Sequence, residues 1–278
     1  MDSYNNHRTG HQNLHTHTNY CDGRLPPEEM VKAAIQNGCD SLGFSEHSYV
    51  PHDPRFSTPP EVEAEYVREI NGLKVKYEGI IEIFLGIEFD YFTAIPLEGL
   101  DFRIGSAHYV QAGGTLYSVD ASPQDQKSLV DEHFGGSFFA MAEVYFETIA
   151  GIMGKTDADI IGHFDLAAKY NMGGSLFDEK HPRYVGAALG AMDEILKGCA
   201  IFEINTKMMY QYNKQEPYPS VFLLKELQKR GGEVVLSSDS HDAGSMCYKF
   251  DDMRELLKTI GFRYLKRLTK DGFIDVKL

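Results

Sequence analysis

Seven strand-like segments of this chain are each followed by residues of the types that bind metal ions. The pairs are 12–14 with His15 and His17, 41–44 with Glu46 and His47, 83–87 with Glu88, 102–105 with His108, 160–162 with His163, 200–202 with Glu203, and 234–236 with Asp239 and His241. Parallel strands in a closed barrel bring their carboxyl ends to one face. We therefore predict that imidazoles and carboxylates from all seven segments meet at one site that holds several metal ions.

Helical patterns alternate with these strand-like segments, which is typical of a parallel sheet. They cover about 26–37, 58–77, 123–132, 138–151, 182–197, 219–229 and 251–259. The 278 residues fit one α/β domain over 1–278, with an insertion at about 112–152. A closed barrel is the simplest architecture. An open doubly wound sheet is the alternative, but it gathers site residues mainly at its switch point rather than at every strand.

Composition narrows the classes of partner. The formal charge is −14, from 27 basic and 41 acidic side chains, which argues against a surface that binds nucleic acid. The first ten residues are polar, and no apolar run approaches a membrane span, so we expect neither a signal peptide nor a membrane partner. The scattered cysteines Cys21, Cys39, Cys199 and Cys247 are expected to be free thiols of a reducing, cytoplasmic compartment.

Spacing within the motifs supports metal binding. Side chains two residues apart point to the same side of an extended chain, so His15 and His17 can reach one ion. Asp239 and His241 repeat this spacing. Each histidine alone has the alternative role of bonding a backbone carbonyl at a strand end. A metal site explains the joint pattern better. The other histidines, at positions 7, 11, 52, 133 and 181, are predicted to be non-ligands, with His11 the strongest exception.

The motifs together resemble a known family. They are HTHT (15–18), SEH (45–47), GIEFD (86–90), GSAH (105–108), GH (162–163) and SDSH (238–241). This set resembles the PHP superfamily of metal-dependent phosphoesterases, and its histidinol-phosphatase branch in particular. The resemblance covers about residues 12–245. It implies a distorted (β/α)7 barrel, similar to a TIM barrel, with three divalent metal ions.

The resemblance also implies a ligand set. One ion takes His15, His17, Glu88 and Asp239. A second takes Glu88, which bridges, with His108 and His163. The third takes His47, His241 and a residue after HTHT, where some relatives have a histidine. This chain has none there, so Asp22 is the predicted ligand and Cys21 the weaker alternative.

The ligand types suit Zn, Mn or Fe(II), whereas Mg alone fits poorly with so many nitrogens. A metal pair about 4 Å apart activates water to hydroxide and clamps a phosphoryl group. Asp239 and Asp165 are candidates for proton transfer, with metal-bound water as the alternative acid. Arg183, Lys207 and Lys169 are candidate phosphate-binding cations, each with a solvated surface charge as the alternative. Glu203 and Asn205 are candidate contacts for the rest of the substrate, with structural roles as the alternative.

The predicted function is hydrolysis of L-histidinol phosphate to L-histidinol and phosphate, a step of histidine biosynthesis, in the cytoplasm. The first rival is another phosphoesterase of this superfamily, acting on phosphotyrosine, nucleotides or oligonucleotides. A hydrolase of C–N bonds on a related barrel is a more distant alternative. Such an enzyme usually needs a carboxylated lysine or a single-metal pattern, and no strand-end lysine is present here. The last rival is a catalytically silent metal-binding module. The sequence leaves the oligomeric state open.

Overall fold

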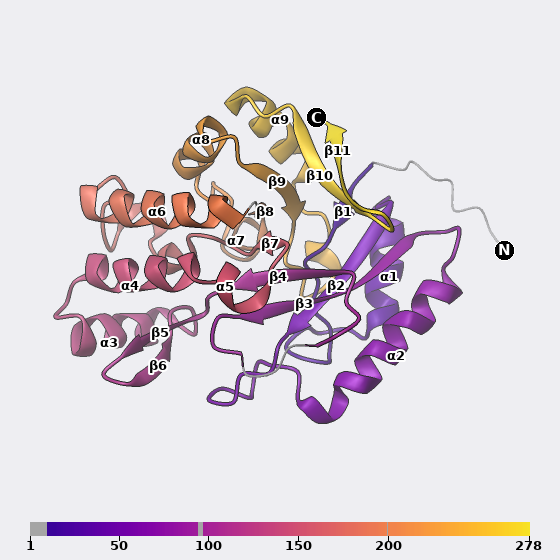
Figure 1. Cartoon of the computed structure of the whole chain (residues 1–278), viewed down its shortest axis with the longest axis horizontal. Helices are drawn as coiled ribbons and strands as arrows, with labels where there is room; N and C mark the ends of the chain where they lie inside the picture. Colours follow the sequence, from indigo (N-terminus) through magenta and orange to yellow (C-terminus); the bar gives the residue numbers. More distant parts are fainter. Residues whose placement is uncertain (1–9, 94–96, 199) are drawn as a thin grey trace.

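A computed structural model describes residues 10–93, 97–198 and 200–278. His7 and Cys199 lie outside the described residues. A seven-stranded parallel sheet organises the fold, in the order β1-β2-β3-β4-β7-β8-β9 (Figure 1). The strands are β1 (Gln12–Asn13), β2 (Ser41–His47), β3 (Glu82–Asp90), β4 (Phe102–Ser106), β7 (Ile160–Ile161), β8 (Ile201–Asn205) and β9 (Glu233–Ser237). Each strand of this sheet pairs in parallel with its neighbour, as the alternating pattern predicts.

The first and last strands meet beyond their paired residues, which bends the sheet into a nearly closed barrel. Thr16 and Ser240 form a parallel bridge. The His17 amide donates to the Ser240 carbonyl at 2.8 Å, and the Ser240 amide donates to the His15 carbonyl at 3.0 Å. These bonds confirm the barrel and exclude the open sheet. They also place the motifs of residues 15–18 and 238–241 side by side.

The interior of the barrel is packed with apolar side chains. Leu14, Phe84, Phe102, Ile104, Ile160, Ile201 and Val235 form one cluster there, with Leu268 and Phe273 from the C-terminal segment packed onto it. Gly43 and Gly86 face the ring of Phe102, and a Cβ atom on either residue would overlap that ring. Close packing therefore requires glycine at both positions. The packed interior of the barrel holds the residues at the strand ends in fixed positions.

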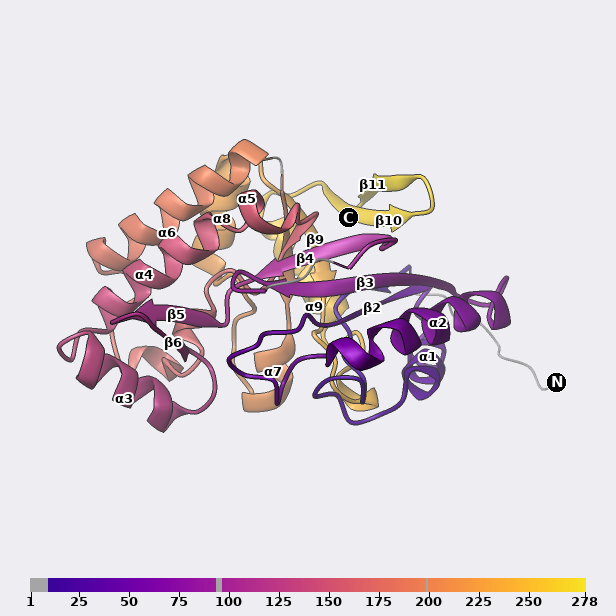
Figure 2. The ribbon, with the colours of Figure 1, turned by 60° about the horizontal axis from the view of Figure 1, so that its bottom comes forward.

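Helices cover the outside of the barrel (Figure 2). They are α1 (Pro27–Gln36), α2 (Pro60–Lys76), α3 (Pro123–His133), α4 (Phe138–Ala150), α5 (Met153–Thr156), α6 (Pro182–Ile195), α7 (Lys207–Tyr212), α8 (Val221–Lys229) and α9 (Phe250–Ile260). The helices α1, α2, α3 and α6 begin with proline, whose fixed φ suits the first turn. The predicted helices are confirmed to within a few residues, while α5 and α7 had no predicted counterpart. Among the described residues, no helix is long and apolar enough to cross a membrane.

The segment between β4 and β7 carries the predicted insertion. It begins with a hairpin of β5 (Tyr109–Ala112) and β6 (Thr115–Ser118), turned by Gly113 and Gly114 at positive φ. The helices α3 and α4 follow, and the hydroxyls of Ser122 and Ser137 accept hydrogen bonds at their N-termini. The hairpin was not predicted, because each of its strands has only four residues and lacks the continuous apolar run of the barrel strands.

A second hairpin without a sequence prediction closes the amino-terminal end of the barrel. It consists of β10 (Tyr264–Thr269) and β11 (Gly272–Lys277). The side-chain amide of Gln12 donates to the Leu268 carbonyl at 2.9 Å and accepts from the Leu268 amide at 2.8 Å. Figure 2 shows the hairpin on the side of the sheet away from α7. The opposite end, where the strands finish, therefore remains accessible.

Candidate metal centre

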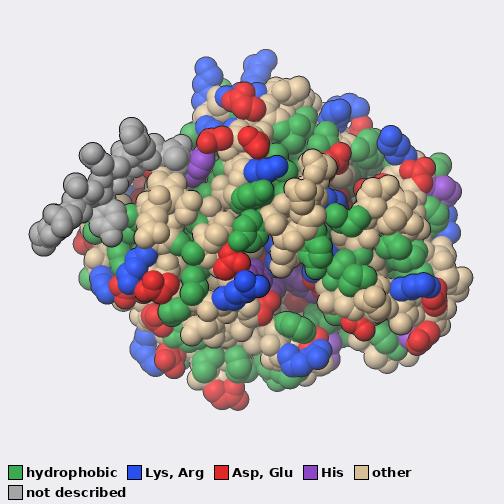
Figure 3. Space-filling view, turned by 180° about the vertical axis from the view of Figure 1, so that it is seen from behind, with side chains coloured by type: hydrophobic (Ala, Val, Ile, Leu, Met, Phe, Trp, Pro, Cys, Tyr) green, Lys and Arg blue, Asp and Glu red, His purple; other side chains and the backbone are tan. Residues whose placement is uncertain are grey.

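A cavity of about 280 Å³ opens at the carboxyl ends of the strands. Its lining includes Asp22, His47, Glu88, His108, His163, Asp239 and His241. Figure 3 shows histidine atoms at the floor of a hollow on this face. The structure therefore brings these predicted residues together at one end of the barrel, because parallel strands end on the same face.

Four side chains from three strand ends converge around one point. His15 Nε2 lies 3.2 Å from Glu88 Oε2 and 3.6 Å from Asp239 Oδ1. His17 Nε2 lies 3.4 Å from the same Glu88 oxygen and 3.3 Å from the same Asp239 oxygen. Ligand atoms at about 2.0–2.1 Å from a tetrahedral zinc ion lie about 3.3 Å apart, so these spacings fit a bound divalent cation.

Unpaired polar atoms point to the same conclusion. In the described part of the chain, His15 Nε2, His17 Nε2 and Glu88 Oε2 are buried and face one another at ion-pair distances, yet none of them has a hydrogen bond of good geometry. Buried polar atoms are rarely left this way, because desolvation without a partner is costly. A metal ion at their centre would satisfy all three atoms. This argues against the alternative in which these histidines only bond backbone carbonyls.

The other oxygen of Glu88 faces a second group. His163 Nε2 lies 2.9 Å from Glu88 Oε1, and His108 Nε2 lies 3.5 Å from it. Ser106 Oγ donates to this oxygen at 2.6 Å. Gly162 leaves space for that hydroxyl, since a Cβ atom at residue 162 would overlap Ser106 Oγ. Glu88 therefore joins two groups of imidazoles, as the predicted bridging role requires.

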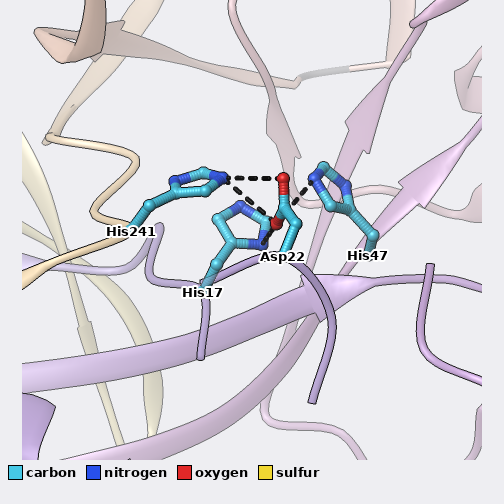
Figure 4. A group of neighbouring side chains, drawn as sticks. All are labelled: His17, Asp22, His47 and His241. Carbon is cyan, nitrogen blue, oxygen red and sulfur yellow. Dashed lines mark hydrogen bonds and ion pairs between the residues drawn. The ribbon is translucent and has the colours of Figure 1, made fainter. Parts of the chain in front are cut away.

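A third group gathers around Asp22 (Figure 4). Asp22 Oδ1 lies 3.2 Å from His241 Nε2, 3.7 Å from His47 Nε2 and 3.9 Å from His17 Nδ1. His47 also reaches the bridging residue, with Nδ1 2.9 Å from Glu88 Oε2. The predicted trio of Asp22, His47 and His241 is thus assembled, and His17 stands beside it.

Cys21 faces a different partner. Its thiol donates to Glu46 Oε2 at 2.7 Å and lies 3.3 Å from His17 Nδ1. Glu46 also accepts from the hydroxyl of Thr18 at 2.6 Å. The structure favours Asp22 over Cys21 for the third ion, because Asp22 is the residue that faces both His47 and His241.

Hydrogen bonds behind the cluster fix which nitrogen three of the imidazoles present. His15 Nδ1 donates to Glu203 Oε2 at 2.8 Å, His108 Nδ1 donates to Asp90 Oδ2 at 3.2 Å, and His241 Nδ1 donates to the Asp239 carbonyl at 3.0 Å. In each case Nε2 is left to face the centre. Partners of this kind orient metal-bound histidines and increase their basicity.

The electrostatics of the cluster favour cations. Burial alone would raise the pKa of Glu88, but His15, His47 and His108 hold it well below its usual value. Burial likewise opposes ionisation of Asp239, yet His15 and Lys207 keep its pKa low. For His17, burial and the neighbouring His47 and His241 lower the pKa well below the ordinary value. The carboxylates are thus ionised and His17 is neutral. The same carboxylates raise the pKa values of His15, His47 and His108, so a bound cation would replace the protons that these imidazoles otherwise hold.

The backbone at Asp239 is held in an uncommon conformation, with φ 46°. Such a left-handed conformation costs energy for a residue other than glycine, and it persists where the surroundings enforce it. The bridge between Thr16 and Ser240 fixes the chain immediately after it. This turn brings the Asp239 carboxylate to His15 and His17.

Two predicted substrate contacts prove to lie behind the centre. Glu203 is 1% exposed and is occupied by His15, the His163 amide and Ser237. Asn205, equally buried, donates to Glu203 Oε1 at 2.8 Å and Asp239 Oδ2 at 3.2 Å. Neither side chain is among the described residues that line the cavity, and both bond to the residues that face its centre.

Two further predicted site residues are not brought to the cavity. Arg183 is 47% exposed in its side chain and forms two bonds, at 2.7 and 2.6 Å, to Glu143. Asp165 is buried, and its Oδ2 accepts from the Ser220 amide at 3.0 Å. The expected alternation fails at Asp165 because β7 ends at Ile161 and a 3₁₀ turn, η1 (Leu166–Ala168), begins directly after it. Neither side chain is among the described residues that line the cavity.

Lys207 and Lys169 do line the cavity. Lys207 Nζ lies 3.1 Å from Asp239 Oδ1 and 3.2 Å from His241 Nε2, at the edge of the cluster. Lys169 Nζ donates at 3.0 Å to the carboxylate of Asp120 and at 3.0 Å to its carbonyl. The pKa of Lys207 is raised, because Asp239 and Asp22 outweigh the effect of its burial. Both ammonium groups are therefore charged and placed to meet an anion.

Sequence reasoning missed several contributors. Asp90 and Ser106 lie inside the quoted motifs but were given no role, and Asp120 was not considered. Asp90 fixes His108, Ser106 fixes Glu88, and Asp120 holds Lys169. Asp90 follows Glu88 by two residues on β3 and could have been found from that spacing. Asp120 lies in a loop after β6, where no strand periodicity predicts its direction.

Comparisons with known proteins agree with this geometry. A family model described as the PHP domain matches residues 13–207. The chain therefore belongs to the PHP domain family, and its barrel is of the PHP type.

Its relatives include histidinol-phosphatases. A histidinol-phosphatase of Bacillus subtilis is 25% identical over 267 residues, covering 87% of this chain and 97% of that protein. A protein of Deinococcus radiodurans named a probable histidinol-phosphatase is 27% identical, covering 92% of this chain and 95% of the other. A histidinol phosphate phosphatase of Lactococcus lactis, solved with zinc, L-histidinol and phosphate, superposes with a TM-score of 0.70 at 22% identity, over 95% of this chain and 99% of that one.

Proposed function

We propose that this protein hydrolyses L-histidinol phosphate to L-histidinol and inorganic phosphate. The observation that carries the proposal is the convergence of three groups of imidazoles and carboxylates, joined by Glu88, in one accessible cavity. The names of the relatives from Bacillus subtilis and Deinococcus radiodurans favour this substrate among phosphate monoesters.

The ligand set proposed is His15, His17, Glu88 and Asp239 for one ion, Glu88, His108 and His163 for the second, and Asp22, His47 and His241 for the third. Neutral imidazoles mixed with carboxylates suit Zn, Mn or Fe(II). When bound, such ions supply Lewis acidity that activates water and neutralises phosphoryl charge. The orphaned atoms of His15, His17 and Glu88 are the part of the structure that supports this loading.

The chain's own cations would bind the phosphate group. Lys207 Nζ adjoins Asp239 and His241, so an anion held beside the cluster meets this ammonium directly. Its hydrogen bonds would strengthen as negative charge moves to the phosphoryl oxygens during the reaction. Asp239 would pass on the proton released by water rather than hold it, because His15 and Lys207 keep its pKa low.

The rest of the substrate would occupy the outer part of the cavity. Histidinol phosphate carries an ammonium group and an imidazole, both of which favour acidic and aromatic surroundings. Asp53, Asp120, Tyr109, Tyr170 and Tyr212 line the cavity away from the metal cluster. Asp120 is paired with the mostly buried Lys169, and Asp53 is paired with the exposed Arg55 at 3.0 Å. An exposed pair contributes little stability, so Asp53 is the carboxylate that more readily exchanges its partner for an added cation.

A substrate panel tests the proposal. Purified protein loaded with Zn or Mn is assayed with histidinol phosphate, an aryl phosphate, nucleoside monophosphates and a short oligonucleotide. We expect kcat/KM for histidinol phosphate to exceed the others by at least about 100-fold, since a site that pairs buried polar groups with a substrate rejects analogues lacking them. A preference for the aryl phosphate or a nucleotide would assign the protein to another PHP phosphoesterase. Bound metal with no turnover of any ester would identify a silent metal-binding module.

A further inference from the structure

Two cysteine side chains lie in contact away from the metal centre. Cys39 stands between α1 and β2, and Cys247 follows the 3₁₀ turn η4 (Ala243–Ser245). Their sulfur atoms are 2.7 Å apart, although 208 positions separate the two residues in the sequence. A disulfide bond needs sulfur atoms about 2.0 Å apart, so a small adjustment of two side chains would allow one.

Packing holds the two cysteines together. Cys39 belongs to the hydrophobic cluster under α1 and α2, and Cys247 packs against the same cluster. Met246, directly before Cys247, is buried in that cluster with Met30 of α1 and Leu42 of β2. The sulfur contact therefore follows from buried neighbours on both sides rather than from two flexible surface side chains.

The exposure of the pair leaves a route for a small reagent. Cys39 is 5% exposed, whereas Cys247 is half-buried. Cys21, the other cysteine among the described residues, donates to Glu46 beside the metal ligands. Cys39 and Cys247 are thus the two described thiols that can react with each other.

We propose that Cys39 and Cys247 are a reversible modification site at which a hydroperoxide forms a disulfide. The sulfur of Cys247 attacks the terminal peroxide oxygen; an S–O bond forms, the O–O bond breaks, and water or an alcohol leaves. The sulfur of Cys39 then attacks the sulfenic sulfur of Cys247; the S–S bond forms, the S–O bond breaks, and water leaves. Two thiols are oxidised and one hydroperoxide is reduced.

The reaction rate should depend on pH. The thiolate is the attacking species. Burial, together with the neighbouring Cys39, raises the pKa of Cys247 well above its usual value. The crosslink should therefore form slowly at neutral pH and faster in alkaline solution, and it should not form without added oxidant.

The crosslink would fasten the loop that carries two metal ligands. Asp239 and His241 lie in the segment between β9 and η4, and the Cys247 amide donates to Ser238 Oγ at 3.1 Å. A bond from Cys247 to Cys39 would tie this segment to the junction of α1 and β2. Because the bond closes a long loop of the unfolded chain, the oxidised protein should melt higher than the reduced one, by on the order of 5 °C.

The experiment uses the full chain loaded with zinc, which avoids reaction of iron with peroxide. The protein is treated with hydrogen peroxide at neutral and alkaline pH, free thiols are alkylated under denaturing conditions, and peptides are mapped without reduction. We expect a peptide pair linked through Cys39 and Cys247, a mass loss of two hydrogen atoms, and reversal by a phosphine reductant. Cys39→Ser and Cys247→Ser are the matched controls, and neither should show the loss.

The peptide map of the oxidised protein distinguishes the proposed disulfide from the other outcomes. Recovery of alkylated Cys39 and Cys247 from oxidised wild-type protein would overturn the proposal. So would independent oxidation of each to a sulfinic acid, or a link from either one to Cys21. The wild-type peptide map needs no variant, so poor folding of a serine variant does not prevent the test.

Discussion

At the residue scale, the site depends most on Glu88. Its Oε2 atom faces His15, His17 and His47, and its Oε1 atom faces His108 and His163. Ser106 fixes the carboxylate by donating to Oε1. One carboxylate therefore contacts imidazoles of all three candidate metal groups. A change to Glu88 should affect the binding of more than one ion.

We predict that Glu88→Gln lowers kcat by more than about 100-fold, because loss of a supporting residue around a metal site already costs about 10- to 100-fold. The amide keeps the size of the side chain but removes the charge that offsets the bound cations. Metal content by mass spectrometry and helical content by circular dichroism are measured beside activity. Glu82→Gln, at the exposed first residue of the same strand, is the control. Full metal content with wild-type turnover in Glu88→Gln would contradict the bridging role.

A second residue-scale prediction compares two cations. Lys207→Met should lower kcat/KM by about 10- to 100-fold with the metal content intact, because it removes a donor beside the reacting anion. Arg183→Met should stay within about twofold, because Arg183 pairs with Glu143 outside the cavity. Steady-state kinetics on both variants checks this. A larger loss for Arg183→Met than for Lys207→Met would reverse the assignment drawn from the structure.

The residues that converge at the candidate metal centre were predictable from the sequence, and the residues that support them were not. His15, His17 and Asp239 follow strands with a spacing that fixes their direction. Glu203 lies in the middle of β8, two residues before the strand ends, and it faces a histidine rather than the cavity. Its direction depends on the neighbouring strand, since Ser237 of β9 and His15 after β1 occupy its oxygens. Local spacing cannot supply such contacts between distant segments.

At the element scale, the helices and barrel strands were predictable from periodicity and from prolines at the helix starts, whereas the two hairpins were not.

His11, the strongest exception among the predicted non-ligands, makes a contact between two elements. Its Nε2 lies 3.0 Å from Asp251 of α9, and its ring packs edge-on against Phe250. His11 therefore fastens the start of β1 to the last helix, far from the metal groups.

We predict that this contact makes stability depend on pH. Burial lowers the pKa of His11 below its ordinary value of 6.5, and attraction to Asp251 offsets this only in part. The unfolded chain therefore binds the proton more tightly, so the stability due to a neutral His11 is complete above pH 6.5 and is lost as pH falls below it. The difference in unfolding free energy between wild type and His11→Gln should shrink from about pH 8 to about pH 5.

Urea denaturation at each pH measures this difference, and effects common to both proteins, such as loss of metal in acid, cancel. His133→Gln, on the exposed end of α3, is the control for replacing a histidine away from this contact. A His11 difference that grows as the solution becomes acidic would contradict the lowered pKa.

At the scale of the whole molecule, the barrel brings its first and last strands together, and this closure completes the site. His15 and His17 come from the start of the chain, while Asp239 and His241 come from near its end. The bonds between residues 15–17 and Ser240 are therefore both part of the barrel and part of the site. Closing the sheet also concentrates acidic side chains at one end of a chain whose formal charge is already −14.

Bound cations should therefore stabilise the entire fold. The unfolded chain scatters the ligand residues and cannot assemble the site, so metal binds the folded state selectively. At a free metal concentration about 100-fold above Kd, the free energy of unfolding rises by about 2.7 kcal/mol, which corresponds to roughly 5–10 °C in melting temperature for a chain of this size.

We predict that a chelator lowers the melting temperature by this amount and that Zn or Mn restores it. Chelator already saturated with zinc is the control, and Glu88→Gln should respond less than wild type. If the metal leaves and the melting temperature stays unchanged, the ions do not contribute to the stability of the barrel.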